Sequence, residues 1–350
     1  MKKFFAAANT ENGFYSLFDE VFAPETFRRI YILKGGPGTG KSTLMGNIGL
    51  IAQSKGYEPE YICCSSDPKS LDGVIIPGLS VAVLDGTAPH ATDPVYPGAV
   101  ERIVDLGAAF DFSRLEAKRE ELVPLIRAKK EAYRTAYRFL SAAGRMEQER
   151  EEMLRSLYLA EKADAAAKRM IASMRNLRRG PERKRYISSV CGDGVYRLDT
   201  LSRQAKKVYA VTDKHGLGYL FMNTLYARLS LEGASCTVCP SPLVRTETEA
   251  IFLEGEDILF MISGEDEAAR ADKTVNSARF VDKEGYARRR QRLRFAEKCR
   301  DAVLEGAFSC FADAAALHAK TERIYGDCLD FTVTDGIMDK IINEIFANNM

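Results

Sequence analysis

Hydrophobic residues in the first hundred positions gather into short runs instead of alternating with polar residues. Such runs are typical of strands covered on both faces, as in a parallel α/β sheet. After the first run and a glycine-rich turn, Leu44, Ile48 and Ile51 recur at helical spacing, and Gly56 is a helix stop. The runs that we predict as strands are residues 31–33, 59–64, 74–76 and 81–84.

A different pattern begins near residue 111. Residues 111–180 are rich in Ala, Arg, Lys, Glu and Leu, and their apolar positions fall on helical spacing. We expect long helices there, with a hairpin turn near Ala143 and Gly144, followed by a linker at residues 178–185. A similar charged and Ala-rich stretch spans residues 280–325.

The chain resembles itself when it is shifted by 178 residues. The segment RIYILKGGPGTG then falls on KVYAVTDKHGLG, and both are followed by a helical pattern. An upstream match, at a slightly different offset, pairs residues 2–17 with residues 183–198. The matched positions include Tyr31 with Tyr209, Gly38 with Gly216, Gly40 with Gly218 and Gly13 with Gly194. This order predicts two tandem domains: residues 1–180, with a helical extension at about 111–180, and residues 184–350.

The turn GGPGTGKS fits the phosphate-binding pattern G-x-x-x-x-G-K-[ST] between a predicted strand and a predicted helix. Its glycines let consecutive backbone N–H groups point inward, and the helix adds the positive end of its dipole. Lys41 is expected to bridge the β- and γ-phosphates, and Ser42 to give one oxygen to Mg²⁺. The predicted nucleotide-binding residues are Gly35, Gly36, Pro37, Gly38, Thr39, Gly40, Lys41, Ser42 and Thr43.

The segment VAVLDG is an apolar strand that ends in Asp85, the Walker-B pattern. Asp85 is expected to hold the magnesium through water, with Asp67 and Asp72 as rivals for that role. No glutamate follows Asp85, and His90 lies a few residues later. We interpret His90 either as a group that orients water or contacts substrate, or as a structural histidine.

The second copy loses the groups that a magnesium–nucleotide site needs. At the repeat offset, Tyr219 stands where the first copy has Lys41, Leu220 where it has Ser42, and Ser263 where it has Asp85. Asp213 and Lys214 replace the first two glycines. We therefore predict that the second loop is degenerate and that its His215 is a relic.

Composition limits the classes of function. The 350 residues are 46% apolar and 28% charged, with a net charge of +1, which gives no general attraction to nucleic acid or membrane. No apolar stretch reaches the ~20 residues that span a bilayer, so a cytoplasmic protein is expected. Cys236 and Cys239 have CxxC spacing, but no second pair follows to complete a zinc site. His318 lies on a helical pattern without an evident companion.

With these motifs, the chain resembles a little-characterised bacterial family of tandem P-loop ATPase-like proteins, within the P-loop NTPase superfamily. The resemblance rests on FFAAANTENGFYS, GGPGTGKST, SLDGVIIPGLSVAVLDGTAPH and YPGAVERIVDLG. It implies two doubly wound, mostly parallel α/β domains with helical extensions, and a P-loop in both halves. The second loop of this chain departs from that pattern. The resemblance supports residues 35–43, Asp85 and His90 as the site.

Together these features predict a Mg²⁺-dependent ATPase that uses the first loop, with the second half regulatory or structural. Two alternatives remain open: a kinase of a nucleotide or small metabolite, and a non-catalytic switch controlled by nucleotide. The expected ligands are ATP and Mg²⁺. The sequence leaves open whether the chain has a protein partner or forms a homo-oligomer.

Overall fold

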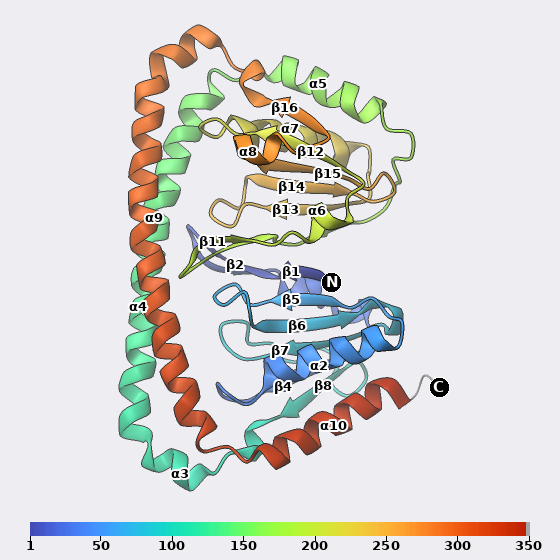
Figure 1. The fold of residues 1–350 in the computed structure, drawn as a ribbon, viewed down its shortest axis with the longest axis vertical. Coiled ribbons are helices and arrows are strands. Elements are labelled where there is room, and N and C mark those ends of the chain that lie inside the picture. Colours follow the sequence, from blue (N-terminus) through green and yellow to red (C-terminus); the bar gives the residue numbers. More distant parts are fainter. Residues whose placement is uncertain (348–350) are drawn as a thin grey trace.

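The computed structural model describes residues 1–347 and contains two α/β units beside a long helical arm (Figure 1). Each unit has a six-stranded mixed sheet. The predicted apolar runs form strands of the first sheet, whose order is β1-β5-β6-β7-β4-β8. These strands are β1 (Lys2–Phe5), β4 (Arg29–Lys34), β5 (Glu60–Cys63), β6 (Leu71–Ile76), β7 (Val81–Asp85) and β8 (Glu101–Asp105).

Strand β6 departs from the parallel arrangement that its apolar run indicated. It is antiparallel to β5 and β7, whereas the β1–β5, β4–β7 and β4–β8 pairs are parallel. The connection explains the direction: β6 and β7 are joined by one short 3-10 turn (Pro77–Leu79), and a parallel crossover needs about a dozen residues or more. Strand β6 therefore begins at the end of the sheet where the carboxyl ends of β4 and β7 lie.

The second sheet has the order β16-β12-β15-β14-β13-β9. The order from β9 to β16 is the same as that from β1 to β8 in the first sheet, with β9, β13, β14, β15, β12 and β16 in the places of β1, β5, β6, β7, β4 and β8. This shared order supports the tandem arrangement. Part of the expected linker at residues 178–185 is an edge strand instead, because β9 pairs in parallel with β13. The strands are β9 (Glu182–Lys184), β12 (Lys207–Thr212), β13 (Cys236–Pro240), β14 (Thr248–Leu253), β15 (Ile258–Ser263) and β16 (Lys273–Asn276).

Two β-hairpins, one from each repeat, lie between the sheets (Figure 1). Gly13 and Gly194 adopt φ values of +100° and +104° at the two turns, a region that favours glycine. Asn9 donates a hydrogen bond from Nδ2 to the Val190 carbonyl at 2.8 Å and so links the hairpins. The hairpins are β2 (Ala7–Thr10) with β3 (Gly13–Ser16), and β10 (Ser188–Cys191) with β11 (Gly194–Arg197).

The two halves share a core. Helix α2 (Lys41–Ser54) packs on the outer face of the first sheet, and α7 (Leu217–Leu231) packs on that of the second. The inner faces meet in one buried cluster, which includes Leu84 from the first half and Tyr186 and Met261 from the second. Burial of apolar surface therefore stabilises the contact between the repeats.

The helical arm consists of α4 (Arg119–Arg155) and α9 (Lys283–Gly326), which lie side by side (Figure 1). Helix α4 continues through Ala143 and Gly144, so the predicted hairpin turn there is wrong. A glycine inside a helix costs only about 1 kcal/mol relative to alanine. Here it permits a close contact, since a Cβ on Gly144 would lie 2.3 Å from the Cβ of Glu11. The helix that pairs with α4 comes from the other repeat.

The helices that follow the arm are exchanged between the repeats. Helix α5 (Ala160–Ala172) follows α4, but its Ala167 is buried in the core around α7. Helix α10 (Phe331–Ala347) follows α9, but its Ile341 and Ile345 are buried in the core around α2. Figure 1 shows α5 and α10 at opposite ends of the molecule. Each half is therefore completed by a helix from the other.

The other described helices are short, and no helix in residues 1–347 combines the length and apolar character needed to cross a membrane. These short helices are α1 (Phe18–Val21), α3 (Phe112–Ala117), α6 (Thr200–Gln204), α8 (Glu265–Ala268) and the 3-10 segments Pro24–Thr26, Gly107–Ala109 and Ser277–Phe280.

Candidate functional site

The first loop (residues 35–43) connects β4 to α2 and leaves several backbone N–H groups without an acceptor in residues 1–347. Gly38 and Gly40 have φ values of +76° and +80°, the left-handed region that favours glycine. Gly40 precedes α2, and no side chain caps this helix end. Within the described chain, the amides of residues 38–43 donate no hydrogen bond. Free N–H groups at a helix amino terminus form the arrangement that binds phosphate.

Lys41 lies against this loop and is largely buried. Its Nζ donates to the carbonyls of Gly36 at 2.9 Å and Gly35 at 3.2 Å. The same nitrogen is 3.7 Å from Oδ2 of Asp85. The parallel register of β4 and β7 pairs Leu33 with Asp85, which explains why the carboxylate reaches the loop. The structure thus brings together the lysine and the aspartate that the sequence predicted separately.

Asp85 and Ser42 place two oxygen ligands near the start of α2. Asp85 Oδ1 accepts hydrogen bonds from the amide and hydroxyl of Thr87 at 2.9 and 2.7 Å, which fixes the carboxylate. Ser42 Oγ accepts from the Leu71 amide at 2.9 Å. A carboxylate and a hydroxyl are hard ligands that suit Mg²⁺, an ion that keeps several waters. These residues fit a magnesium ion held partly by phosphate oxygens.

Asp72 lies across from Asp85. The antiparallel register of β6 and β7 pairs Gly73 with Leu84, and the next position along each strand is Asp72 and Asp85. Asp72 and Asp85 therefore stand on neighbouring strands at the same end of the sheet. Asp72 is only 6% exposed. This second buried carboxylate depends on the reversed direction of β6, which the sequence did not reveal.

His90 joins the site through Asp72. Its Nε2 is 3.4 Å from Oδ2 of Asp72, and its ring stacks on Phe18 with centroids 4.4 Å apart. Its Nδ1 is buried without a hydrogen-bond partner. Asp67, in contrast, is exposed and accepts a hydrogen bond from Ser70 Oγ at 2.7 Å within its own turn. Of the two rival aspartates, Asp72 is therefore the buried one, on the strand next to that of Asp85.

The second loop (residues 213–218) fills its own anion position. Asp213 Oδ1 accepts from the Gly218 amide at 2.8 Å, and Oδ2 accepts from the Gly216 amide at 3.2 Å. His215 Nδ1 lies 2.9 Å from Oε2 of Glu297. A carboxylate of the chain thus occupies the helix terminus that the first loop leaves open. Asp213 stands at the repeat position of Gly35, so this replacement of glycine by aspartate is the feature of the sequence that indicates a filled second loop.

Helix α9 of the arm covers one side of the first loop, a contact between the two repeats that no local sequence pattern indicates. A Cβ on Gly38 would lie 2.9 Å from the carbonyl oxygen of Glu322 in α9. A Cβ on Gly36 would lie 3.0 Å from the ring of Phe110 and 3.2 Å from that of Tyr325. The second and fourth residues of the motif must therefore be small for packing as well as for conformation.

The CxxC cysteines lie away from the first loop. Cys236 and Cys239 are buried in β13 of the second sheet, and burial raises the pKa of Cys236 to about 12. In residues 1–347, no three His, Cys, Asp or Glu side chains gather into a group suited to a metal ion. These thiols pack as small apolar groups in the sheet.

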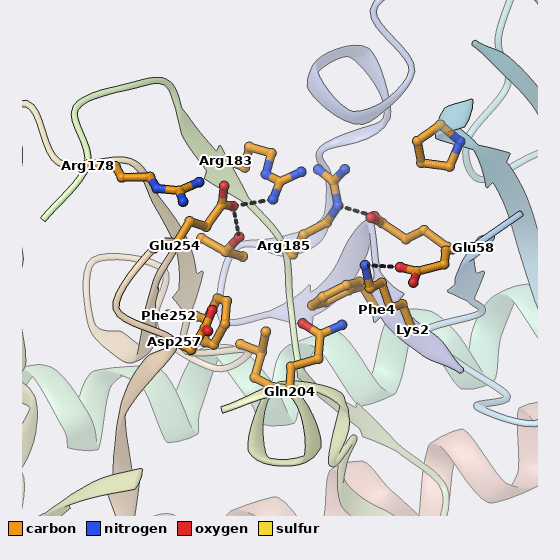
Figure 2. Close-up of a pocket in the computed structure, with 15 residues that line it drawn as sticks. Lys2, Phe4, Glu58, Arg178, Arg183, Arg185, Gln204, Phe252, Glu254 and Asp257 are labelled. Carbon is orange, nitrogen blue, oxygen red and sulfur yellow. Dashed lines mark hydrogen bonds and ion pairs between the residues drawn. The ribbon is translucent and has the colours of Figure 1, made fainter. Parts of the chain in front are cut away.

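A cavity of about 520 Å³ lies between the sheets, where β1 and β5 begin (Figure 2). Four of the basic side chains that line it are Lys2, Arg178, Arg183 and Arg185, and three of these have acidic partners. Lys2 lies 2.9 Å from Glu58, Arg185 lies 2.6 Å from Glu60, and Arg183 pairs with Glu254. The first loop follows the carboxyl end of β4, at the opposite end of the strands from this cavity. This volume is therefore separate from the loop chemistry.

Searches against known protein families, curated proteins and solved structures found no match to this chain.

Proposed function

We propose that the chain binds one magnesium–nucleoside triphosphate, ATP, at the first loop and hydrolyses its terminal phosphoanhydride bond. One observation carries the proposal: the N–H groups of residues 38–43 have no acceptor in the described chain, and the ammonium of Lys41 lies against the same loop. A triphosphate supplies both the acceptors and the negative charge. Because Asp213 occupies the second loop, we expect one nucleotide per chain.

Each polar group has a distinct part in this proposal. The loop amides and Lys41 bind the phosphates, and Lys41 exchanges its contacts with loop carbonyls for phosphate oxygens. Ser42 and Asp85 would hold Mg²⁺, which neutralises charge on the phosphates when it is bound. Asp72, with His90 as its neighbour, is the buried carboxylate available to orient the attacking water.

The reaction follows from these roles. A water oxygen forms a bond to the terminal phosphorus while the bond from that phosphorus to the bridging oxygen breaks. The products are ADP, inorganic phosphate and a proton. Catalysis of this step depends mainly on positioning and on charge stabilisation, so a site with few side chains is sufficient.

The test measures nucleotide binding and phosphate release by the full chain, by Lys41→Ala and by Lys214→Ala. Lys214 is the exposed lysine of the second loop and serves as the matched control. We expect Lys41→Ala to lose binding or turnover and Lys214→Ala to retain both. Equal loss in the two variants contradicts the proposal. ADP formation that requires an added metabolite pool would show a kinase, and binding without turnover would show a switch.

A further inference from the structure

Three charged or titratable side chains on the arm form a chain of contacts over the first loop. Lys129 of α4 places its Nζ 3.2 Å from Nδ1 of His318 in α9. The other ring nitrogen, Nε2, lies 3.5 Å from Oε1 of Glu322, one turn further along α9. The carbonyl of Glu322 is the atom that packs against Gly38. Lys129 of α4 is thus linked through His318 to the residue of α9 that packs against the first loop.

Lys129 is a cation without a paired anion. No carboxylate lies within salt-bridge distance of its Nζ in the described chain, and its nearest polar partner is a histidine ring. Burial lowers the pKa of Lys129, although the charge of Glu322 opposes that effect. A half-buried ammonium without a carboxylate partner gains more from a nearby anion than a solvated lysine does.

His318 connects this cation electrostatically to the phosphate loop. Burial lowers the pKa of His318, and the charges of Lys129 and Lys41 lower it further, while Glu322 and Asp67 oppose them. The neutral ring can accept a hydrogen bond from Lys129 at Nδ1 and direct its Nε2 proton toward Glu322. His318 thereby fixes the direction in which the Lys129 side chain extends.

We propose that Lys129 binds the terminal phosphate of the nucleotide in the first loop, and that His318 is its positioning residue. This inference rests on the proposed function. The lysine comes from α4 of the first repeat, and the histidine comes from α9 of the second repeat, so the site is completed across the two halves. A cation placed at the terminal phosphate stabilises the triphosphate but has no partner in the diphosphate.

The experiment compares Lys129→Met with Lys130→Met in the full chain. Lys130 is the exposed neighbour on α4 and controls for loss of charge. Calorimetry measures the affinity for Mg²⁺ with the β,γ-imido analogue of ATP, and separately for Mg²⁺ with ADP. We expect Lys129→Met to weaken binding of the triphosphate analogue about tenfold, as for loss of a hydrogen bond to a charged group, and to leave ADP affinity unchanged. Lys130→Met should change neither.

A second pair of variants tests the histidine. His318→Gln keeps an acceptor for Lys129 and should retain most of the preference for the triphosphate, whereas His318→Leu should lose it. Equal affinities of Lys129→Met and the unaltered chain for the analogue would overturn the inference while leaving nucleotide binding intact. Equal loss of analogue and ADP binding would also overturn it. Failure of the unaltered chain to bind either nucleotide would overturn the proposed function itself.

Discussion

Asp213 accepts a hydrogen bond from the amide of Gly218 at 2.8 Å, at the place where the first repeat leaves its amides free. With the second bond from Gly216, this carboxylate caps the start of α7. The two duplicated loops therefore differ in their backbone hydrogen bonding: a carboxylate of the chain accepts from the second loop, whereas the amides of residues 38–43 in the first loop have no acceptor in the described chain. Five predictions follow from this difference and from the packing around it.

Asp213→Ala should destabilise the second half. The substitution removes an acceptor for two amides and a negative charge at a helix amino terminus, which together are worth about 1–2 kcal/mol. Urea unfolding measures the change in free energy. Asp193→Ala is the control, since Asp193 is exposed in a hairpin turn. Equal stability of the two variants would contradict the capping role.

Asp85→Asn should weaken the dependence of nucleotide binding on magnesium. Loss of a carboxylate that holds the ion through water typically costs about 10–100-fold in metal affinity. Metal-free nucleotide should bind as well as before, because the substitution also removes a negative charge near the phosphates. Titration of Mg²⁺ at fixed nucleotide measures this effect. Asp67→Asn is the control, and a larger loss there would transfer the metal role to Asp67.

Asp72→Asn should slow phosphate release more than it weakens binding. A group that orients or deprotonates water contributes about 10²–10⁴-fold to the rate, whereas Asp72 is not expected to contact the phosphates. Single-turnover phosphate release, compared with calorimetric affinity, separates the two effects. His90→Gln should lower the rate less, since His90 acts through Asp72. A loss of affinity as large as the loss of rate would place Asp72 among the binding groups instead.

Ile341→Ala should destabilise the first half, although residue 341 belongs to the second repeat. Its side chain is 4% exposed in the core around α2, and a Leu or Ile truncated to Ala in a core costs about 2–5 kcal/mol. Lys340→Ala, on the exposed face of the same helix, should change stability little. Amide hydrogen exchange in β4 and α2 would locate the effect. Unchanged protection of those elements would show that α10 is dispensable for the first core.

Acid should weaken the arm contact through His318. Its pKa is lowered in the folded chain from an ordinary value of 6.5, chiefly by burial and by Lys129. The folded state therefore favours the neutral ring, and its stabilising contribution is present above pH 6.5 and is lost as the pH falls toward the lower folded pKa. Unfolding midpoints between about pH 5 and pH 8 measure this loss. His318→Gln should flatten the dependence of the unfolding midpoint on pH. Identical pH profiles of this variant and the unaltered chain would contradict the role of His318.

Much of the fold was predictable from local pattern. The apolar runs located β4 and β7, the helical spacing located α2, and the internal match predicted two units whose strands proved to share one order. The motif also indicated which loop could bind phosphate, because the need for small residues and a lysine acts within a few positions of the chain. In the second copy, Asp213 at a glycine position already signalled a changed loop.

The direction of β6, the continuity of α4 and the exchange of α5 and α10 needed the tertiary structure. A short apolar run is compatible with either strand direction, and an interior glycine weakens a helix without ending it. Asp72 lies at the same end of the sheet as Asp85 only because β6 is reversed, and His318 meets Lys129 only because α4 and α9 pair across the repeats. Sequence thus determined the local elements and the glycine-rich first loop, which depend on neighbouring residues. Contacts between distant residues decided what surrounds that loop, because burial of apolar surface does not depend on separation along the chain.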